Sequence, residues 1–165
     1  MEIRSIGIIG AGQMGNGIAH VTALAGYRVV MMDISQDSLT AALSLIEKNL
    51  ERQVSSAKIT AAEKAKALAQ IDTTLDISKV GQADLVIEAA TEDETIKQSI
   101  FDLLLPHLQD HTILTSNTSS ISITRLASRT DRPEKFMGFH FMNPVPVMKL
   151  VELIRGIATD ETTYA

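Results

Sequence analysis

The chain has 165 residues, of which 45% are hydrophobic and 21% charged, the proportions of one globular domain with a real core. A net charge of −5 disfavours nucleic acid as a partner, and the absence of cysteine excludes disulfides, a thiolate nucleophile and cysteine-ligated zinc. No apolar run approaches the roughly 20 residues of a membrane span. No signal peptide precedes the first predicted strand, so we expect a cytoplasmic protein without a membrane partner.

The predicted elements alternate between strands and helices along most of the chain. In order, the sequence predicts strand 4–9, helix 14–25, strand 27–33, a helix capped by Ser35, a helix opened by the capping box Thr60–Glu63, strand 84–89, helix 93–105, strand 112–116, helix 121–128, and strands 136–142 and 149–154. This order favours an α/β fold with a doubly wound, mostly parallel Rossmann-type sheet. Residues 51–70 are expected to form a helical excursion after the second strand. The last eight residues look like a helix start without the helix that should follow.

The hexapeptide "GAGQMG" is a complete G-x-G-x-x-G pattern between a predicted strand and a predicted helix, the setting typical of dinucleotide binding. Gly10 permits a tight turn, Gly12 lets the backbone approach a pyrophosphate, and Gly15 lets the helix and strand pack closely. The amides of Gln13 and Met14, in the first helical turn, are expected to face the anion with the helix dipole behind them.

Asp33 ends the second predicted strand, where a carboxylate accepts hydrogen bonds from the hydroxyls of an adenosine ribose. The same negative charge repels a 2′-phosphate, so the sequence favours NAD over NADP. The alternative is a tight structural turn followed by an exposed acid. The agreement of strand, glycines, helix and acid disfavours that alternative.

Polar residues gather where the later predicted strands end. Glu92 follows one strand, the segment "SNTSS" (116–120) follows the next, and His140 and Asn143 close a third. Because ligands of an open α/β sheet bind beyond the carboxyl ends of its strands, we expect these side chains along the dinucleotide edge. No spacing of His, Asp and Glu predicts a metal site, and no base accompanies Ser119 in a hydrolase motif.

His140 and Glu152 are separated by a turn that contains Pro144 and Pro146. A dehydrogenase acting on an alcohol must remove the hydroxyl proton as hydride leaves carbon, and histidine exchanges protons near neutral pH. A carboxylate on the far ring nitrogen fixes the tautomer and stabilises the imidazolium. We therefore expect Glu152 to be a buried acid paired with a catalytic His140. The alternative is a structural histidine and a surface acid at a strand end.

Four longer motifs carry a resemblance to a known family: "IGIIGAGQMGNGIA", "ADLVIEAATED", "SNTSSISIT" and "HFMNPVPVMKLVELIRG". With them the chain resembles, over nearly its whole length, the N-terminal NAD-binding domain of 3-hydroxyacyl-CoA dehydrogenases, particularly bacterial 3-hydroxybutyryl-CoA dehydrogenases. The resemblance implies oxidation of the 3-hydroxyl of an acyl-CoA with NAD, or the reverse, and 3-hydroxybutyryl-CoA and acetoacetyl-CoA as the substrate pair. It implies that His140 is the general base and that Glu152 orients it.

The resemblance also implies roles for residues around that pair. Ser119 is similar to a contact to the substrate hydroxyl that also lies near the nicotinamide, and Asn143 to a residue on the nicotinamide side. Glu92 and Lys97 are similar to groups that hold the nicotinamide ribose. Asn117 belongs to the same motif as Ser119 and is an expected cofactor contact.

The chain departs from the family pattern in two places. Relatives carry a lysine-rich stretch after the long second helix that helps hold the CoA phosphates, whereas this chain has "VSSAK" and offers Arg52 and Lys58. The family also continues into an all-helical C-terminal domain, which supplies a catalytic asparagine, acyl contacts and the homodimer interface. We therefore expect residues 1–165 to be a truncated NAD-binding domain with weak or no turnover alone.

Three further readings of the sequence remain open. An isolated NAD-binding module would bind NADH without turnover. A 3-hydroxyadipyl-CoA dehydrogenase would need a cation for the distal carboxylate of its substrate. A dehydrogenase of the 3-hydroxyisobutyrate or 6-phosphogluconate type would use a lysine base and would lack "HFMNP", so this reading is the least favoured.

Overall fold

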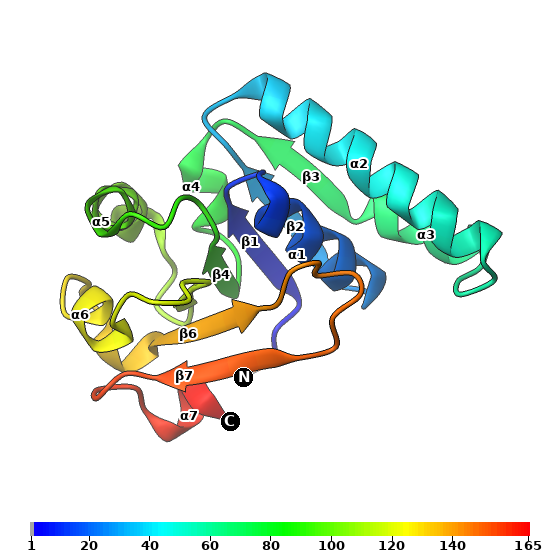
Figure 1. Cartoon of the computed structure of the whole chain (residues 1–165). Coiled ribbons are helices and arrows are strands. Elements are labelled where there is room, and N and C mark those ends of the chain that lie inside the picture. The colour runs from blue at the N-terminus through cyan, green and yellow to red at the C-terminus, as the bar shows by residue number, and fades with distance from the viewer. Residues whose placement is uncertain (1) are drawn as a thin grey trace.

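The computed structural model describes residues 2–165, which form one mostly parallel sheet with helices on both faces (Figure 1). The strands are β1 (Ser5–Ile9), β2 (Arg28–Met32), β3 (Ile71–Thr74), β4 (Leu85–Glu88), β5 (Ile113–Ser116), β6 (Phe136–Phe141) and β7 (Val151–Arg155). The helices are α1 (Gln13–Leu24), α2 (Gln36–Ser55), α3 (Ala61–Ala69), α4 (Ile77–Val80), α5 (Glu94–Leu104), α6 (Ile123–Ala127) and α7 (Glu161–Tyr164). Short 3₁₀ turns cover Leu105–His107 and Pro133–Lys135.

The strands follow the spatial order β3-β2-β1-β4-β5-β6-β7. All neighbours pair in parallel except β6 and β7, which are antiparallel. The predicted doubly wound, mostly parallel sheet is therefore confirmed. Between β1 and β4 the strand order reverses, and a crevice for ligands opens at such a point, beyond the carboxyl ends of the strands.

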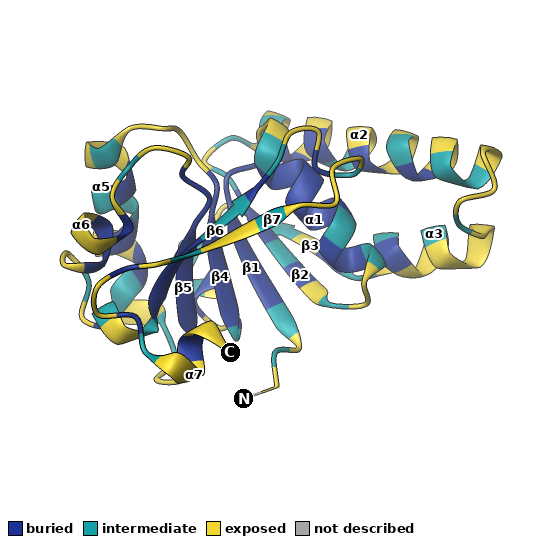
Figure 2. Cartoon of the chain, turned by 60° about the horizontal axis from the view of Figure 1, so that its bottom comes forward, coloured by how far each residue is buried: buried dark blue, intermediate teal, exposed yellow. Residues whose placement is uncertain are grey.

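Two apolar clusters cover the two faces of this sheet. One contains the buried sides of α1, α2 and α3, and the other contains those of α4, α5 and α6. The central strand β4 is buried along its whole length, as expected for a parallel strand covered on both sides (Figure 2). Within residues 2–165, no helix is both long enough and apolar enough to cross a membrane.

Three short elements differ from the sequence prediction. Strand β3 was not predicted because only its end residues, Ile71 and Thr74, are buried, so the segment lacks an apolar run. Helix α4 is a single turn capped by Asp76, too short to show a helical period. The expectation that no helix follows the last helix-start signal is wrong, because Asp160 caps the short helix α7.

The expected helical excursion consists of α2 and α3, which pack against each other and against α1. Ser35 caps α2 as predicted, because its side chain accepts a hydrogen bond from the amide of Ser38, and α2 continues to Ser55. Thr60 and Glu63 form the predicted capping box at the start of α3. Beyond β3, the pair of helices extends past the edge of the sheet (Figure 1).

Asp84 joins the beginnings of the central strands β1 and β4, at the end of the sheet opposite the crevice. Its carboxylate accepts hydrogen bonds from the amides of Arg4 and Ser5, both at 2.9 Å, and lies 3.0 Å from His111 Nε2. Burial by itself raises the pKa of Asp84, but the hydrogen bonds from Arg4, Ser5 and His111 outweigh it and lower the pKa to about 2. The folded state therefore favours the ionised carboxylate.

Substitution Asp84→Asn is expected to lower the free energy of unfolding by roughly 2 kcal/mol at pH 7. Because the folded-state pKa lies below the unfolded value, this stabilisation is complete above about pH 4 and is lost as the pH falls toward 2. Urea unfolding of both proteins at pH 7 and pH 2.5 measures the difference. A difference of the same size at both pH values would contradict this account.

Candidate functional site

The glycine loop between β1 and α1 has the geometry of a phosphate cradle. Gly10 has φ +104°, and a Cβ atom there would lie 2.6 Å from the Ala89 carbonyl oxygen. A Cβ atom on Gly15 would lie 1.8 Å from the Gly10 carbonyl oxygen, so helix and loop leave no room for a side chain. Apart from Gly12 itself and its neighbours in the sequence, no residue of the described chain has an atom within 4 Å of a Cβ placed on Gly12.

Helix α1 begins directly after this open space. Gly12 is its N-cap residue, and no side chain caps the helix, so the amides of Gln13 and Met14 in its first turn face the open space above the loop. An anion above Gly12 meets these amides and the positive end of the helix dipole. The loop therefore fits a pyrophosphate group.

Asp33 lies beside the glycine loop at the end of β2. Its Oδ2 accepts a hydrogen bond from the Ala11 amide at 2.9 Å, and its Oδ1 accepts one from the Ser35 amide at 3.0 Å. These two amides orient the carboxylate at the rim of a cavity of about 530 Å³. The cavity is lined by Gly10, Gly12, Asp33, the segment 89–91 and mainly apolar side chains, namely Ile9, Met32, Ile34, Ile77, Ile96, Ile100 and Leu103.

This cavity fits the adenosine part of a dinucleotide. Its walls are apolar, as an adenine ring requires, and Ile34 is 91% exposed at its rim. Asp33 provides the acceptor for ribose hydroxyls, and the open face of Gly12 continues the cavity toward the phosphate cradle.

Glu92, Asn117 and Ser119 lie beyond the ends of β4 and β5. Glu92 accepts a hydrogen bond from the hydroxyl of Thr118 and one from the Ser119 amide at 3.4 Å. Asn117 is buried, and its Oδ1 accepts a hydrogen bond from the Phe141 amide at 2.8 Å. Asn117 therefore ties the segment after β5 to β6, a structural contact that its motif did not reveal.

His140 and Glu152 stand directly opposite each other in the antiparallel pair β6–β7. Nδ1 of His140 lies 2.8 Å from Oε2 of Glu152. The side chain of His140 is 18% exposed and that of Glu152 is 50% exposed. The prediction of a pair is confirmed, but the prediction of a buried acid is wrong, because β7 is the last strand of the sheet and none of its residues is buried.

The segment after β6 brings this pair close to the glycine loop. The side-chain amide of Gln13 donates a hydrogen bond to Asn143 Oδ1 at 3.2 Å. Val145 packs so closely on α1 that a Cβ atom on Gly17 would lie 2.8 Å from its own Cβ. The histidine, Asn143 and the phosphate cradle therefore lie together at the end of the sheet where the parallel strands terminate.

Lys97 is buried and does not line the surface at this end of the sheet. Its side chain is 2% exposed, and its Nζ lies 2.7 Å from Oε2 of Glu88, a carboxylate with no exposed surface. Sequence reasoning did not single out Glu88. A signal was available, because one carboxylate ends the otherwise apolar strand "LVIE" and a buried acid needs a partner.

Arg52 and Lys58 line a cavity of about 260 Å³ between α1, α2 and the segment after β6. His20 lies in the same cavity with its Nε2 3.0 Å from Gln53 Oε1. Burial lowers the pKa of His20, although the hydrogen bond to Gln53 opposes that shift, so the ring is neutral at pH 7. A partly apolar cavity that is lined by two cations and a neutral imidazole fits an anionic ligand with an uncharged arm.

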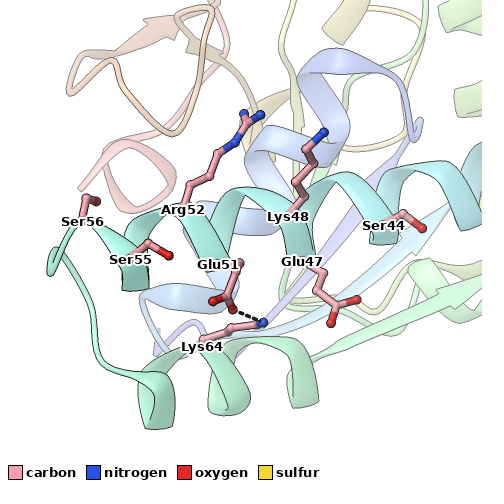
Figure 3. Close-up of a pocket in the computed structure, with 8 residues that line it drawn as sticks. All are labelled: Ser44, Glu47, Lys48, Glu51, Arg52, Ser55, Ser56 and Lys64. Atoms are coloured by element: carbon pink, nitrogen blue, oxygen red, sulfur yellow. Dashed lines mark hydrogen bonds and ion pairs between the residues drawn. The ribbon is translucent and has the colours of Figure 1, made fainter.

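A wider and more open depression of about 680 Å³ lies over α2 and α3 (Figure 3). Glu51 and Lys64 form an ion pair of 2.6 Å across it, while Lys48 and Arg52 point together to the other side of α2. Among the predicted site residues only Arg52 lines it. Among residues 2–165, no cluster of three or more His, Asp or Glu side chains is placed to hold a metal ion.

The fold and this edge define a dinucleotide-binding α/β domain with a histidine–carboxylate pair beside the cofactor cleft. The chain belongs to the 3-hydroxyacyl-CoA dehydrogenase family, because the family model described as "3-hydroxyacyl-CoA dehydrogenase, NAD binding domain" matches residues 5–165. The predicted family and the predicted cofactor, NAD, are confirmed.

Individual relatives agree with this assignment. The chain is 56% identical over 162 residues to a 3-hydroxybutyryl-CoA dehydrogenase of Bradyrhizobium diazoefficiens, covering 98% of this chain and 55% of that protein. It is 43% identical to a 3-hydroxyadipyl-CoA dehydrogenase of Escherichia coli, covering 96% and 34%. The crystal structure of an (S)-3-hydroxybutyryl-CoA dehydrogenase from Ralstonia eutropha superposes with a TM-score of 0.96 at 47% identity, covering 99% and 58%. The chain thus spans about half the length of the curated 3-hydroxybutyryl-CoA dehydrogenases it matches.

Proposed function

We propose that this chain provides the NAD-binding half of an enzyme that interconverts 3-hydroxybutyryl-CoA and acetoacetyl-CoA, with His140 as the general base. The observation that carries the proposal is the pair of His140 and Glu152, 2.8 Å apart, on the same sheet edge as the glycine loop. Identity to relatives named for this reaction supports the choice of substrate.

The chemistry of the pair follows from its hydrogen bond. Bound NAD supplies the acceptor for the hydride that leaves the 3-carbon. Glu152 holds Nδ1–H of His140, which leaves Nε2 to take the proton of the substrate hydroxyl. The imidazolium that forms is stabilised by the Glu152 carboxylate, and in the reverse direction Nε2 returns the proton.

The remaining predicted residues serve binding in this proposal. Asp33 holds the adenosine ribose, and the amides above Gly12 hold the pyrophosphate. Ser119 contacts the substrate hydroxyl close to the nicotinamide. Asn143, oriented by Gln13, lines the nicotinamide side, and Glu92 contacts the nicotinamide ribose.

Arg52 and Lys58 bind the CoA phosphates in this proposal. They border the cavity that also contains Pro144 and Pro146, in the segment that joins His140 to Glu152. An acyl-CoA held there by its phosphates extends its acyl end toward the histidine. For the whole protein we propose a homodimer acting in the cytoplasm.

Two alternatives rest on particular observations. The E. coli relative is named for 3-hydroxyadipyl-CoA, which favours a dicarboxylic acyl-CoA as a second candidate substrate. The family model that matches residues 5–165 is that of an NAD binding domain, which favours a second candidate role as a module that binds NADH without turnover.

The test measures the absorbance change as the 165-residue chain consumes NADH, once with acetoacetyl-CoA and once with 3-oxoadipyl-CoA. The two rates separate these possibilities. Because the chain is proposed as only the NAD-binding half of the enzyme, the expected result is weak turnover that is faster with acetoacetyl-CoA. Faster turnover of 3-oxoadipyl-CoA would transfer the assignment to the dicarboxylic substrate. A folded chain that binds NADH and consumes neither substrate would establish the binding module.

A further inference from the structure

Thr118 is a buried residue in the turn between β5 and α6, and it has no part in the mechanism above. Its side chain donates a hydrogen bond from Oγ1 to Oε1 of Glu92, which lies in the loop between β4 and α5. The same oxygen accepts hydrogen bonds from the amides of Ser120 at 3.3 Å and Ile121 at 3.0 Å. One hydroxyl group therefore joins the loops that follow two neighbouring strands.

The direction of these hydrogen bonds follows from the groups that take part. Backbone amides can only donate, so the amides of Ser120 and Ile121 use the lone pairs of the Thr118 oxygen. A hydroxyl group has one proton, and that proton is left for the carboxylate of Glu92. The hydroxyl of Thr118 thus uses its donor and both lone pairs within the protein.

Glu92, in contrast, is exposed and gains most from a restraint. A glutamate side chain has several rotatable bonds, and fixing it when a ligand binds costs affinity unless the free protein already holds it in place. The Ser119 amide also donates to Glu92, but at 3.4 Å, which is longer than the usual range for a hydrogen bond. The orientation of the Glu92 carboxylate therefore depends mainly on Thr118.

A different contact holds together the helices behind these two loops. Arg125 on α6 donates from Nε and Nη2 to the carboxylate of Glu94 in the first turn of α5, both at 2.6 Å. Because this ion pair joins α5 to α6 directly, the hydroxyl of Thr118 is left to restrain the loop residues.

We propose that Thr118 is a positioning residue that holds Glu92 toward the nicotinamide half of the bound dinucleotide. Thr91, immediately before Glu92 in the chain, lines the cofactor cavity, which places Glu92 at the border of that cavity. Thr118 acts through Glu92 and does not itself contact the cofactor. This inference rests on the proposed function, in which Glu92 contacts the nicotinamide ribose.

The test compares two substitutions that separate the hydroxyl group from stability. Thr118→Val keeps the shape of the side chain and removes the hydroxyl, whereas Thr118→Ser keeps the hydroxyl and removes a buried methyl group. Both are expected to lower the temperature of unfolding. The dissociation constant for NADH, measured by fluorescence titration, is expected to rise about tenfold in Thr118→Val and to stay within about twofold in Thr118→Ser. Unchanged binding in a folded Thr118→Val variant, or an equal loss in both variants, would overturn the proposal.

ADP is the second probe, because it fills the adenosine and phosphate sites and lacks the nicotinamide half. Thr118→Val is expected to bind ADP as tightly as the unaltered chain does, measured by competition with NADH. An equal loss of affinity for ADP and NADH would show a general distortion of the site and would overturn the proposal. Thr112→Val is the matched control, since the buried hydroxyl of Thr112 donates to the Ala83 carbonyl oxygen at 2.8 Å at the opposite end of β5. It is expected to lose stability and to keep NADH binding.

A double-mutant cycle with Glu92 tests whether Thr118 contacts the cofactor directly. Glu92→Ala is expected to weaken NADH binding. Adding Thr118→Val to it is expected to cause little further loss, because the residue through which Thr118 acts is already absent. A further loss as large as that of Thr118→Val alone would indicate a direct contact and would overturn the positioning role.

The same titrations keep the two proposals distinguishable. An unaltered chain that is folded and binds neither ADP nor NADH would contradict the assignment of the cavity as a cofactor site. An unaltered chain that binds both, with NADH bound equally well by Thr118→Val, would contradict only the positioning role of Thr118.

Discussion

Substitution His140→Ala is expected to lower the already weak kcat of this chain for the reduction of acetoacetyl-CoA by about 10²–10⁴-fold, the usual contribution of a general acid or base. Binding of NADH is expected to be unchanged, because the cofactor cavity is formed by residues around the glycine loop and Asp33, not by His140. Steady-state kinetics and a fluorescence titration with NADH measure the two quantities in the same preparation.

Glu152→Gln tests the partner of the histidine separately. Glutamine occupies the same space on the exposed side of β7 and offers an oxygen to Nδ1, but it carries no charge to stabilise the imidazolium. We expect a loss in kcat that is clear but smaller than that of His140→Ala. Since Glu152 is half-exposed, we expect no measurable change in the unfolding midpoint.

The chain provides a matched control for this pair. His111 also faces a carboxylate, with its Nε2 3.0 Å from Asp84, but at the opposite edge of the sheet. His111→Ala is expected to retain kcat. A similar loss of activity in His111→Ala and His140→Ala would show that loss of a histidine–carboxylate pair disturbs the fold, and would contradict the assignment of His140 as the base.

The substitutions Gly12→Ala and Gly15→Ala are expected to affect different properties. At Gly15 the new methyl group meets the Gly10 carbonyl oxygen at 1.8 Å, which is a backbone atom and cannot move aside easily. The expected loss in free energy of unfolding is about 3 kcal/mol or more. At Gly12 the methyl group meets no atom, so stability is expected to be kept.

For NADH binding, the expectation for Gly12→Ala is a dissociation constant raised by about 10–100-fold, because the methyl group occupies the space above the first turn of α1. Thermal unfolding and NADH titration of both variants check this contrast. Tight NADH binding by Gly12→Ala would place the pyrophosphate elsewhere and would remove the main geometric support for the cofactor site.

The sequence by itself determined the features that depend on a few neighbouring residues. The glycine pattern requires a strand before it and a helix after it, and both are present in the structure. The caps of α2 and α3 are local hydrogen bonds made within four residues of each other. The family and its cofactor also followed from contiguous motifs, which is why the comparisons confirm them.

Tertiary structure alone decided the features that depend on contacts between distant segments. No local signal predicts the polar edge strand β3, the burial of Lys97, or the hydrogen bond that Asn117 accepts from the Phe141 amide. The pairing of His140 with Glu152 was predicted from the turn between them, but the exposure of Glu152 was not. A side chain's chemistry can be read from its type, whereas its burial and its partners depend on which strands and helices pack around it.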